Sequence, residues 1–129
     1  MDYGMTVRLR APFAETVERV RAALKDQGFG VLTEIDVRAT VRDKLGEEME
    51  DYLILGACNP PLAHRALEVD RRIGLLLPCN VVVRADGDQS VVEALDPQVM
   101  VGVSGQPALE PVAEEATRRL AAALEGLGS

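Results

Sequence analysis

The chain has 129 residues, of which 47% are hydrophobic and 27% charged, and its formal net charge is −7. This length is enough to bury a core without disulfides or metals, so it predicts a single domain over residues 1–129. Binding of nucleic acid relies on a basic face and on stacking side chains. The acidic balance and the four aromatic residues therefore argue against a nucleic-acid partner.

The sequence also argues against insertion in a membrane and against secretion. The longest apolar runs, Ile73 to Leu77 and Val81 to Val83, are far too short to cross a bilayer. The first residues lack a basic segment followed by an apolar one, so we expect a cytoplasmic protein with reduced cysteines. Twelve arginines against two lysines are compatible with a GC-rich or thermophilic bacterial source.

The first third of the chain predicts two strand–helix pairs. Asp2 to Arg10 alternates apolar and polar residues, as a half-buried strand does. Apolar residues then recur every three or four positions from Phe13 to Leu24, which predicts a helix that ends at Gly28. Residues 29–35 predict a second strand, and the spacing of apolar residues predicts a helix from Val37 to Leu45.

A third strand and helix follow. Met49 to Ala57 is almost continuously apolar at its end, which indicates a strand in a central position covered on both faces. Asn59 is a favoured N-cap and Pro60 a favoured first helical residue, so we expect a helix from Pro60 to about Val69.

The last part of the chain predicts a hairpin and a closing helix. Cys79 to Ala85 and Ser90 to Leu95 are joined by Asp86-Gly87-Asp88, where glycine supplies the positive φ of a tight turn. An irregular link from Asp96 to Gly105, with its glycines interpreted as a plain turn, leads to a helix from Pro107 to Leu127.

The predicted order β-α-β-α-β-α-β-β-α indicates an α+β fold with a mostly antiparallel sheet and helices on one face. An apolar sheet face left open by so small a domain is commonly covered by a second copy, and a two-fold dimer is the most frequent solution. We therefore expect a homodimer.

Candidate chemistry gathers between Leu53 and Val83, a stretch that holds both cysteines, the only histidine and both asparagines. Each cysteine lies beside an apolar run and is followed at once by asparagine. The leading hypothesis is a non-catalytic binding domain in which Cys58, Asn59, Cys79 and Asn80 line a small pocket for a metal ion, a thiol or another small ligand. No cofactor is predicted.

An enzyme is the alternative interpretation. Cys58 directly precedes a predicted helix, whose first amides favour a thiolate. Cys58 would then be a nucleophile or redox group, Cys79 its resolving thiol, and His64 a base oriented by Glu68. A third interpretation is a purely structural subunit, because isolated cysteines are usually buried and inert.

A metal site that includes the histidine is a further option. Twenty residues separate the cysteines, which fits neither Cys-x-x-Cys nor a zinc knuckle. If the two strands are neighbours, however, Cys58, Cys79 and His64 would offer three soft ligands for zinc or copper(I). His64 lies on the polar side of its predicted helix, which favours a solvated histidine instead.

Two motifs carry a family resemblance. They are Leu55-Gly56-Ala57-Cys58-Asn59-Pro60 and the Leu-Leu-Pro-Cys-Asn run that ends at Asn80, supported by Gly28-Phe29-Gly30-Val31 and Asp96-Pro97. With them the chain resembles, over nearly its whole length, the domain of unknown function 302 (DUF302) family. The resemblance implies a compact bacterial or archaeal α+β domain, related to the TATA-binding-protein-like class of folds, that forms homodimers. It implies no activity and no catalytic residue.

Overall fold

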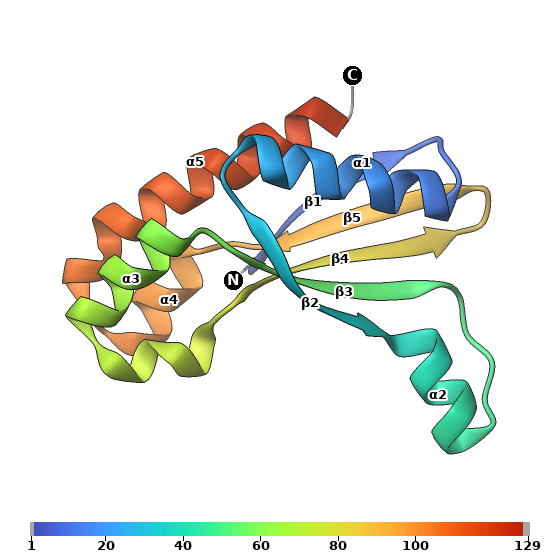
Figure 1. Cartoon of the computed structure of the whole chain (residues 1–129), viewed down its shortest axis with the longest axis horizontal. Helices are drawn as coiled ribbons and strands as arrows, with labels where there is room; N and C mark the ends of the chain where they lie inside the picture. Colours follow the sequence, from blue (N-terminus) through green and yellow to red (C-terminus); the bar gives the residue numbers. More distant parts are fainter. Residues whose placement is uncertain (1, 128–129) are drawn as a thin grey trace.

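Five antiparallel strands form one sheet in the spatial order β1-β5-β4-β3-β2 (Figure 1). The computed structural model describes residues 2–127. The strands are β1 (Gly4–Leu9), β2 (Gly30–Asp36), β3 (Tyr52–Cys58), β4 (Cys79–Asp86) and β5 (Gln89–Leu95). The α-helices are α1 (Phe13–Asp26), α2 (Val37–Leu45), α3 (Pro60–Val69), α4 (Gln98–Ser104) and α5 (Glu110–Leu127), with 3₁₀ helices η1 (Arg71–Leu76) and η2 (Pro107–Leu109).

The long helices α1 and α5 lie side by side on one face of the sheet (Figure 1). Helices α3 and α4 gather at one end of the molecule, and α2 projects from the other end. The predicted α+β fold, with an antiparallel sheet and its helices on one face, is confirmed. Among residues 2–127, no helix combines the length and the apolar character that crossing a membrane requires.

Two sequence-based expectations need correction. The link predicted to be irregular contains α4, which begins where the Asp96 carboxylate accepts a hydrogen bond from the Gln98 N–H at 2.9 Å. Packing of the buried Met100 outweighs the low helix propensity of Gly102. Strand β3 is covered by helices on one face only. Tyr52 and Ile54 point to its other face and are therefore only half-buried.

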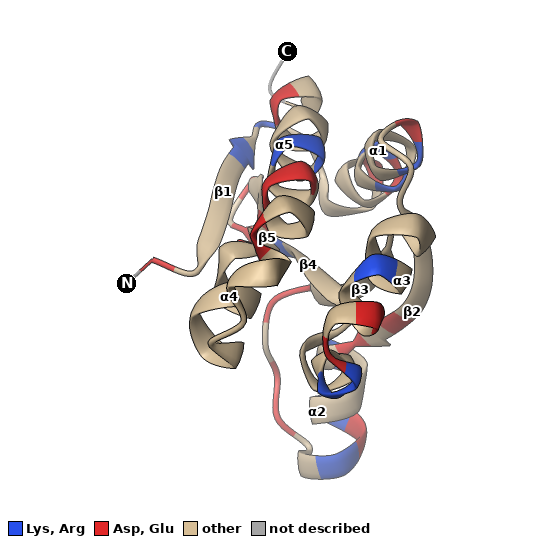
Figure 2. Ribbon diagram, turned by 90° about the vertical axis from the view of Figure 1, so that its left-hand side faces the viewer, with Lys and Arg blue, Asp and Glu red and all other residues tan. Residues whose placement is uncertain are grey.

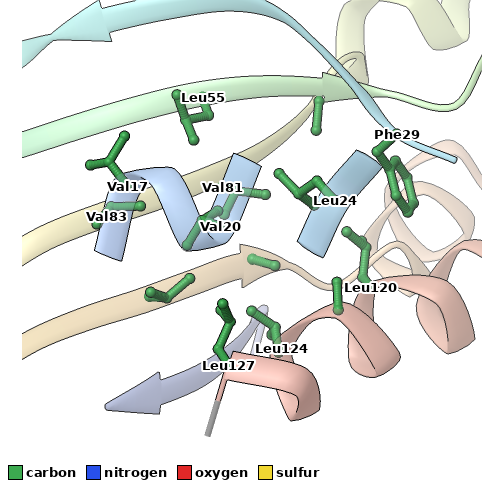
Figure 3. Packing of buried hydrophobic residues seen from close by; sticks show 14 of the residues in the cluster. Val17, Val20, Leu24, Phe29, Leu55, Val81, Val83, Leu120, Leu124 and Leu127 are labelled. Carbon is green, nitrogen blue, oxygen red and sulfur yellow. The ribbon is translucent and has the colours of Figure 1, made fainter. Parts of the chain in front are cut away.

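The main core lies between the sheet and the pair α1 and α5 (Figure 3). Its side chains come from one stripe of each helix and from alternate positions of the central strands. The labelled members are Val17, Val20, Leu24, Phe29, Leu55, Val81, Val83, Leu120, Leu124 and Leu127. A second, smaller cluster joins α3, η1, α4 and α5 and includes Leu62, Ile73, Met100 and Leu109.

The end of α1 brings Phe29 into the core. Gly28 has a φ of +84°, its N–H donates to Lys25 O, and the Phe29 N–H donates to Leu24 O at 2.9 Å. These two bonds make a Schellman motif, which needs a left-handed residue at the position of Gly28. The turn folds the Phe29 ring back toward Leu24 and Leu120 (Figure 3).

Acidic residues follow α2 and continue to the start of β3 (Figure 2). This segment contains Glu47, Glu48, Glu50 and Asp51. The Asp51 carboxylate binds the Arg38 guanidinium at 2.8 Å and so connects the end of the segment to α2.

Gly56 allows β2 and the residue before Cys79 to approach β3 closely. A Cβ atom at Gly56 would overlap Thr33 Oγ1 and would lie 2.9 Å from Pro78 Cγ. We therefore expect Gly56→Ala to lower the free energy of unfolding by about 1–3 kcal/mol, the usual effect of overpacking. Urea denaturation of the parent and the variant measures the difference.

Gly102→Ala is the matched control for Gly56→Ala. Its Cβ would meet nothing within 4 Å and its position is helical, so we expect an unchanged or slightly higher stability. Removing Thr33 Oγ1 with Thr33→Ala should return part of the stability lost in Gly56→Ala. A Gly56→Ala variant as stable as the Gly102→Ala control would contradict the prediction.

Candidate functional site

The two cysteines lie at the same end of the sheet because β3 and β4 are neighbours. In the antiparallel register Ala57 lies opposite Cys79, so Cys58 is diagonal to Cys79. Cys58 is the last residue of β3 and Cys79 the first residue of β4. The strand pairing therefore places at one end of the sheet two cysteines that twenty residues separate in the sequence, and both thiols are free.

A small hollow of about 30 Å³ lies at this end of the sheet, where the main core meets the second cluster. Cys58, Asn59 and Cys79 border it from the sheet side, and Met100 borders it from α4. The other walls are almost wholly apolar and come from α3 and α5, with Phe29 and the segment before β4. The hollow thus has sulfur-bearing residues on two sides and few polar atoms.

Asn59 borders the hollow and caps helix α3. Its side chain is buried, and its Oδ1 accepts a hydrogen bond from the Leu62 N–H at 3.2 Å, which caps α3. The prediction of an N-cap at Asn59 followed by Pro60 as the first helical residue is confirmed. The cap fixes the direction in which α3 leaves β3, and α3 forms one wall of the hollow.

Asn80 and His64 lie elsewhere. Asn80 is exposed on the sheet, where with Tyr3 and Tyr52 it borders a separate, shallow depression of about 310 Å³. His64 is exposed on α3, and its Nδ1 lies 3.1 Å from a Glu68 carboxylate oxygen. The structure therefore brings three of the four predicted pocket residues together and places Asn80 apart from them.

The metal option with His64 as third ligand is wrong. Within residues 2–127, the His, Cys, Asp and Glu side chains form no group of three or more that could hold a metal ion. The reason is helical geometry, because Leu62 and Ala66 take the inward face of α3 and leave His64 on the solvent side.

The environment of both thiols favours the protonated form. Burial raises the pKa of Cys79, and the nearby Cys58 raises it further, to about 11. Burial also raises the pKa of Cys58. A helix N-terminus was expected to lower the pKa of Cys58, but the Leu62 amide at the start of α3 is already bonded to the Asn59 side chain. Neither thiol has the depressed pKa of an activated nucleophile.

Met100 is the site residue that the sequence analysis missed. It is 3% exposed and borders the hollow from α4, within the segment interpreted as irregular. Asp96-Pro97 ahead of the segment and Gly105 after it, with a φ of +67°, are signals for the start and end of a helix. These signals indicate the helix, but they do not show that it packs beside the hollow.

Comparison with known proteins decides the family. The model of the family described as "Domain of unknown function DUF302" matches residues 5–127. The chain belongs to the DUF302 family. The crystal structure of an uncharacterized conserved DUF302 protein from Bacillus stearothermophilus is similar to this DUF302 domain, with a TM-score of 0.92 and 32% sequence identity. The match covers 98% of this chain and 99% of that one.

Part of the DUF302 domain is also similar to curated bacterial proteins. "Fluoride-specific ion channel FluC 1" of Brucella suis biovar 1 and its namesake of Brucella abortus biovar 1 are each 36% identical to it over 93 residues. The aligned part covers 70% of this chain and 36% or 34% of those proteins. The chain thus spans about a third of the length of these relatives. The channel activity in their name belongs to those proteins.

Proposed function

We propose that this DUF302 domain is a small binding domain whose hollow between Cys58 and Cys79 holds one small ligand, namely a metal ion, a thiol or another species of few atoms. The observation that carries the proposal is that both free cysteines border one apolar hollow. A structural role alone requires no hollow beside the thiols, because cores are normally packed without such gaps.

The size of the hollow limits the ligand. A water molecule needs roughly 10–15 Å³ of such space, so about 30 Å³ admits one ion or a group of a few atoms. Pockets for cofactors and drug-sized molecules span roughly 300–1,000 Å³. A thiol ligand would therefore insert its sulfur end and leave the rest of the molecule outside.

An enzyme that uses Cys58 as its nucleophile has less support. The pKa of Cys58 is raised by burial, and His64 faces solvent beside Glu68 rather than the thiol. A nucleophilic cysteine normally has a base within hydrogen-bond reach and a lowered pKa. Binding needs neither.

Native mass spectrometry and elemental analysis of the gently purified protein test the binding proposal. The parent is compared with the double variant Cys58→Ala, Cys79→Ala and with His64→Gln as the matched control. We expect one bound species per chain in the parent and the control, and none in the double variant. If the parent is empty and takes up neither zinc, copper(I) nor glutathione at millimolar concentration, the proposal is wrong.

We also propose that the domain forms a homodimer through an arm made of β2 and α2. Strand β2 is an edge strand, and its Leu32 and Ile35 are 69% and 50% exposed. No side chain of residues 37–45 is buried, and Leu45 is 70% exposed. Open edges and exposed apolar side chains are features of surfaces that pair with another chain.

Sedimentation velocity tests this pairing. We expect the parent to sediment as a dimer and the Leu32→Lys variant as a monomer, because a charge on the exposed edge opposes its burial. Leu75→Lys is the matched control, since Leu75 is 79% exposed but lies in η1, outside the arm. A monomeric parent, or an unchanged dimer in Leu32→Lys, would overturn the proposal.

A further inference from the structure

We infer that the hollow is a site for copper(I), held by the sulfur atoms of Cys58, Cys79 and Met100. The inference rests on the proposed binding function and names its ligand. Three of the five sulfur-bearing residues among residues 2–127 border this one hollow of about 30 Å³. They come from β3, β4 and α4, and residues of all three elements line the hollow.

Met100 is well placed to serve as the third sulfur ligand. It is 3% exposed and lies in the second cluster, with α4 packed against α5 and η1. A thioether in such a position is desolvated before a metal arrives. Met100 occupies the place in the ligand set that His64, on the solvent side of α3, cannot take.

The chemistry of the walls selects the kind of ion. Thiolate and thioether sulfur are soft ligands that prefer copper(I), an ion that is stable with two or three of them. Calcium and magnesium need oxygen ligands, and magnesium also keeps several waters, for which an apolar hollow of this size has no room. A structural zinc ion needs four ligands, and the described part of the chain provides no group of three from Cys, His, Asp and Glu.

Binding is a ligand exchange without oxidation. Each thiol releases its proton to solvent as its sulfur bonds to copper(I), and the Met100 thioether donates a lone pair without losing a proton. The ion enters and stays as copper(I), so no electron donor or acceptor is needed.

Anaerobic titration with copper(I), in competition with the chelator bicinchoninate, tests the inference. We expect the parent to bind one copper(I) per chain and Met100→Leu to bind at least about tenfold more weakly, since even outer-shell partners of a metal typically contribute that factor. Met5→Leu is the matched control, because Met5 packs at the edge of the main core away from the hollow, and it should bind as the parent does. X-ray absorption should count three sulfur neighbours of copper in the parent and two in Met100→Leu.

The outcomes separate this inference from the proposed function. If the hollow takes up zinc or a thiol through its cysteines but not copper(I), the inference is wrong and the binding function stands. The same holds if Met100→Leu binds copper(I) as tightly as the parent. If Cys79→Ala alone leaves affinity unchanged, the two thiols do not share an ion and the inference also fails. Circular dichroism of Met100→Leu, a substitution of similar volume, verifies that the variant is folded.

Discussion

Replacing Leu120 by alanine should lower the free energy of unfolding by about 2–5 kcal/mol, the range observed for truncation of buried leucines. Leu120 is fully buried on α5, near Leu24 of α1 and Phe29 (Figure 3). It joins three parts of the main core that are distant in sequence. The cavity left by the lost methyl groups cannot close readily, because a helix, a turn and the sheet would have to move together.

Leu75→Ala is the matched control for Leu120→Ala. The same atoms are removed, but Leu75 is 79% exposed on η1, so we expect a change within about 0.5 kcal/mol. Urea denaturation with one slope for all variants measures both effects. Similar losses for Leu75→Ala and Leu120→Ala would mean that the main core does not depend on α5 in the way the structure indicates.

The local signals of the sequence predict most of the fold. The spacing of Val17, Val20 and Leu24 predicts the buried stripe of α1, and all three are buried. The turn between β4 and β5 is also predicted, with Gly87 at a φ of +62°. These features depend on residues close in sequence, where periodicity and turn chemistry act directly. Helix α4 was missed because Gly102 within it lowers helix propensity and its glycines were interpreted as a turn, although Asp96-Pro97 and Gly105 are signals for its start and end.

The candidate site was predicted only in part, for a different reason. Strand neighbours decide which side chains meet, and this pairing involves residues far apart in the sequence. Cys58 and Cys79 both border the hollow at one end of the β3–β4 pair, whereas Asn80, one residue after Cys79, is exposed. Alternation along a strand sends successive side chains to opposite faces, so adjacency in sequence separates Cys79 and Asn80 in space. Met100 borders the hollow from α4, a helix that follows β5 and whose position depends on tertiary packing.

The environment of Cys79 makes stability depend on pH in the alkaline range. Burial, and then the neighbouring Cys58, raise the pKa of Cys79 from 9.0 to about 11. Between these values the unfolded chain loses a proton that the folded chain keeps, so the unfolded state binds fewer protons. The free energy of unfolding therefore falls as pH rises. The contribution of the protonated Cys79 to stability is complete below pH 9 and is lost as pH rises through about 11.

Urea denaturation at several pH values from 8 to 11 measures this loss. A shift of this size corresponds to about 2–3 kcal/mol, so the parent should lose that much more stability than Cys79→Ala over the interval. Comparison with this variant subtracts the titration of tyrosines and lysines, which both proteins share. Cys58→Ala is the second control. It keeps the buried thiol but removes the Cys58 charge that helps to raise the folded pKa of Cys79, so the loss should be smaller than in the parent and should end at a lower pH. Parallel curves for the parent and Cys79→Ala would show that Cys79 has the same pKa in the folded as in the unfolded chain, which would contradict the burial of this thiol beside the hollow.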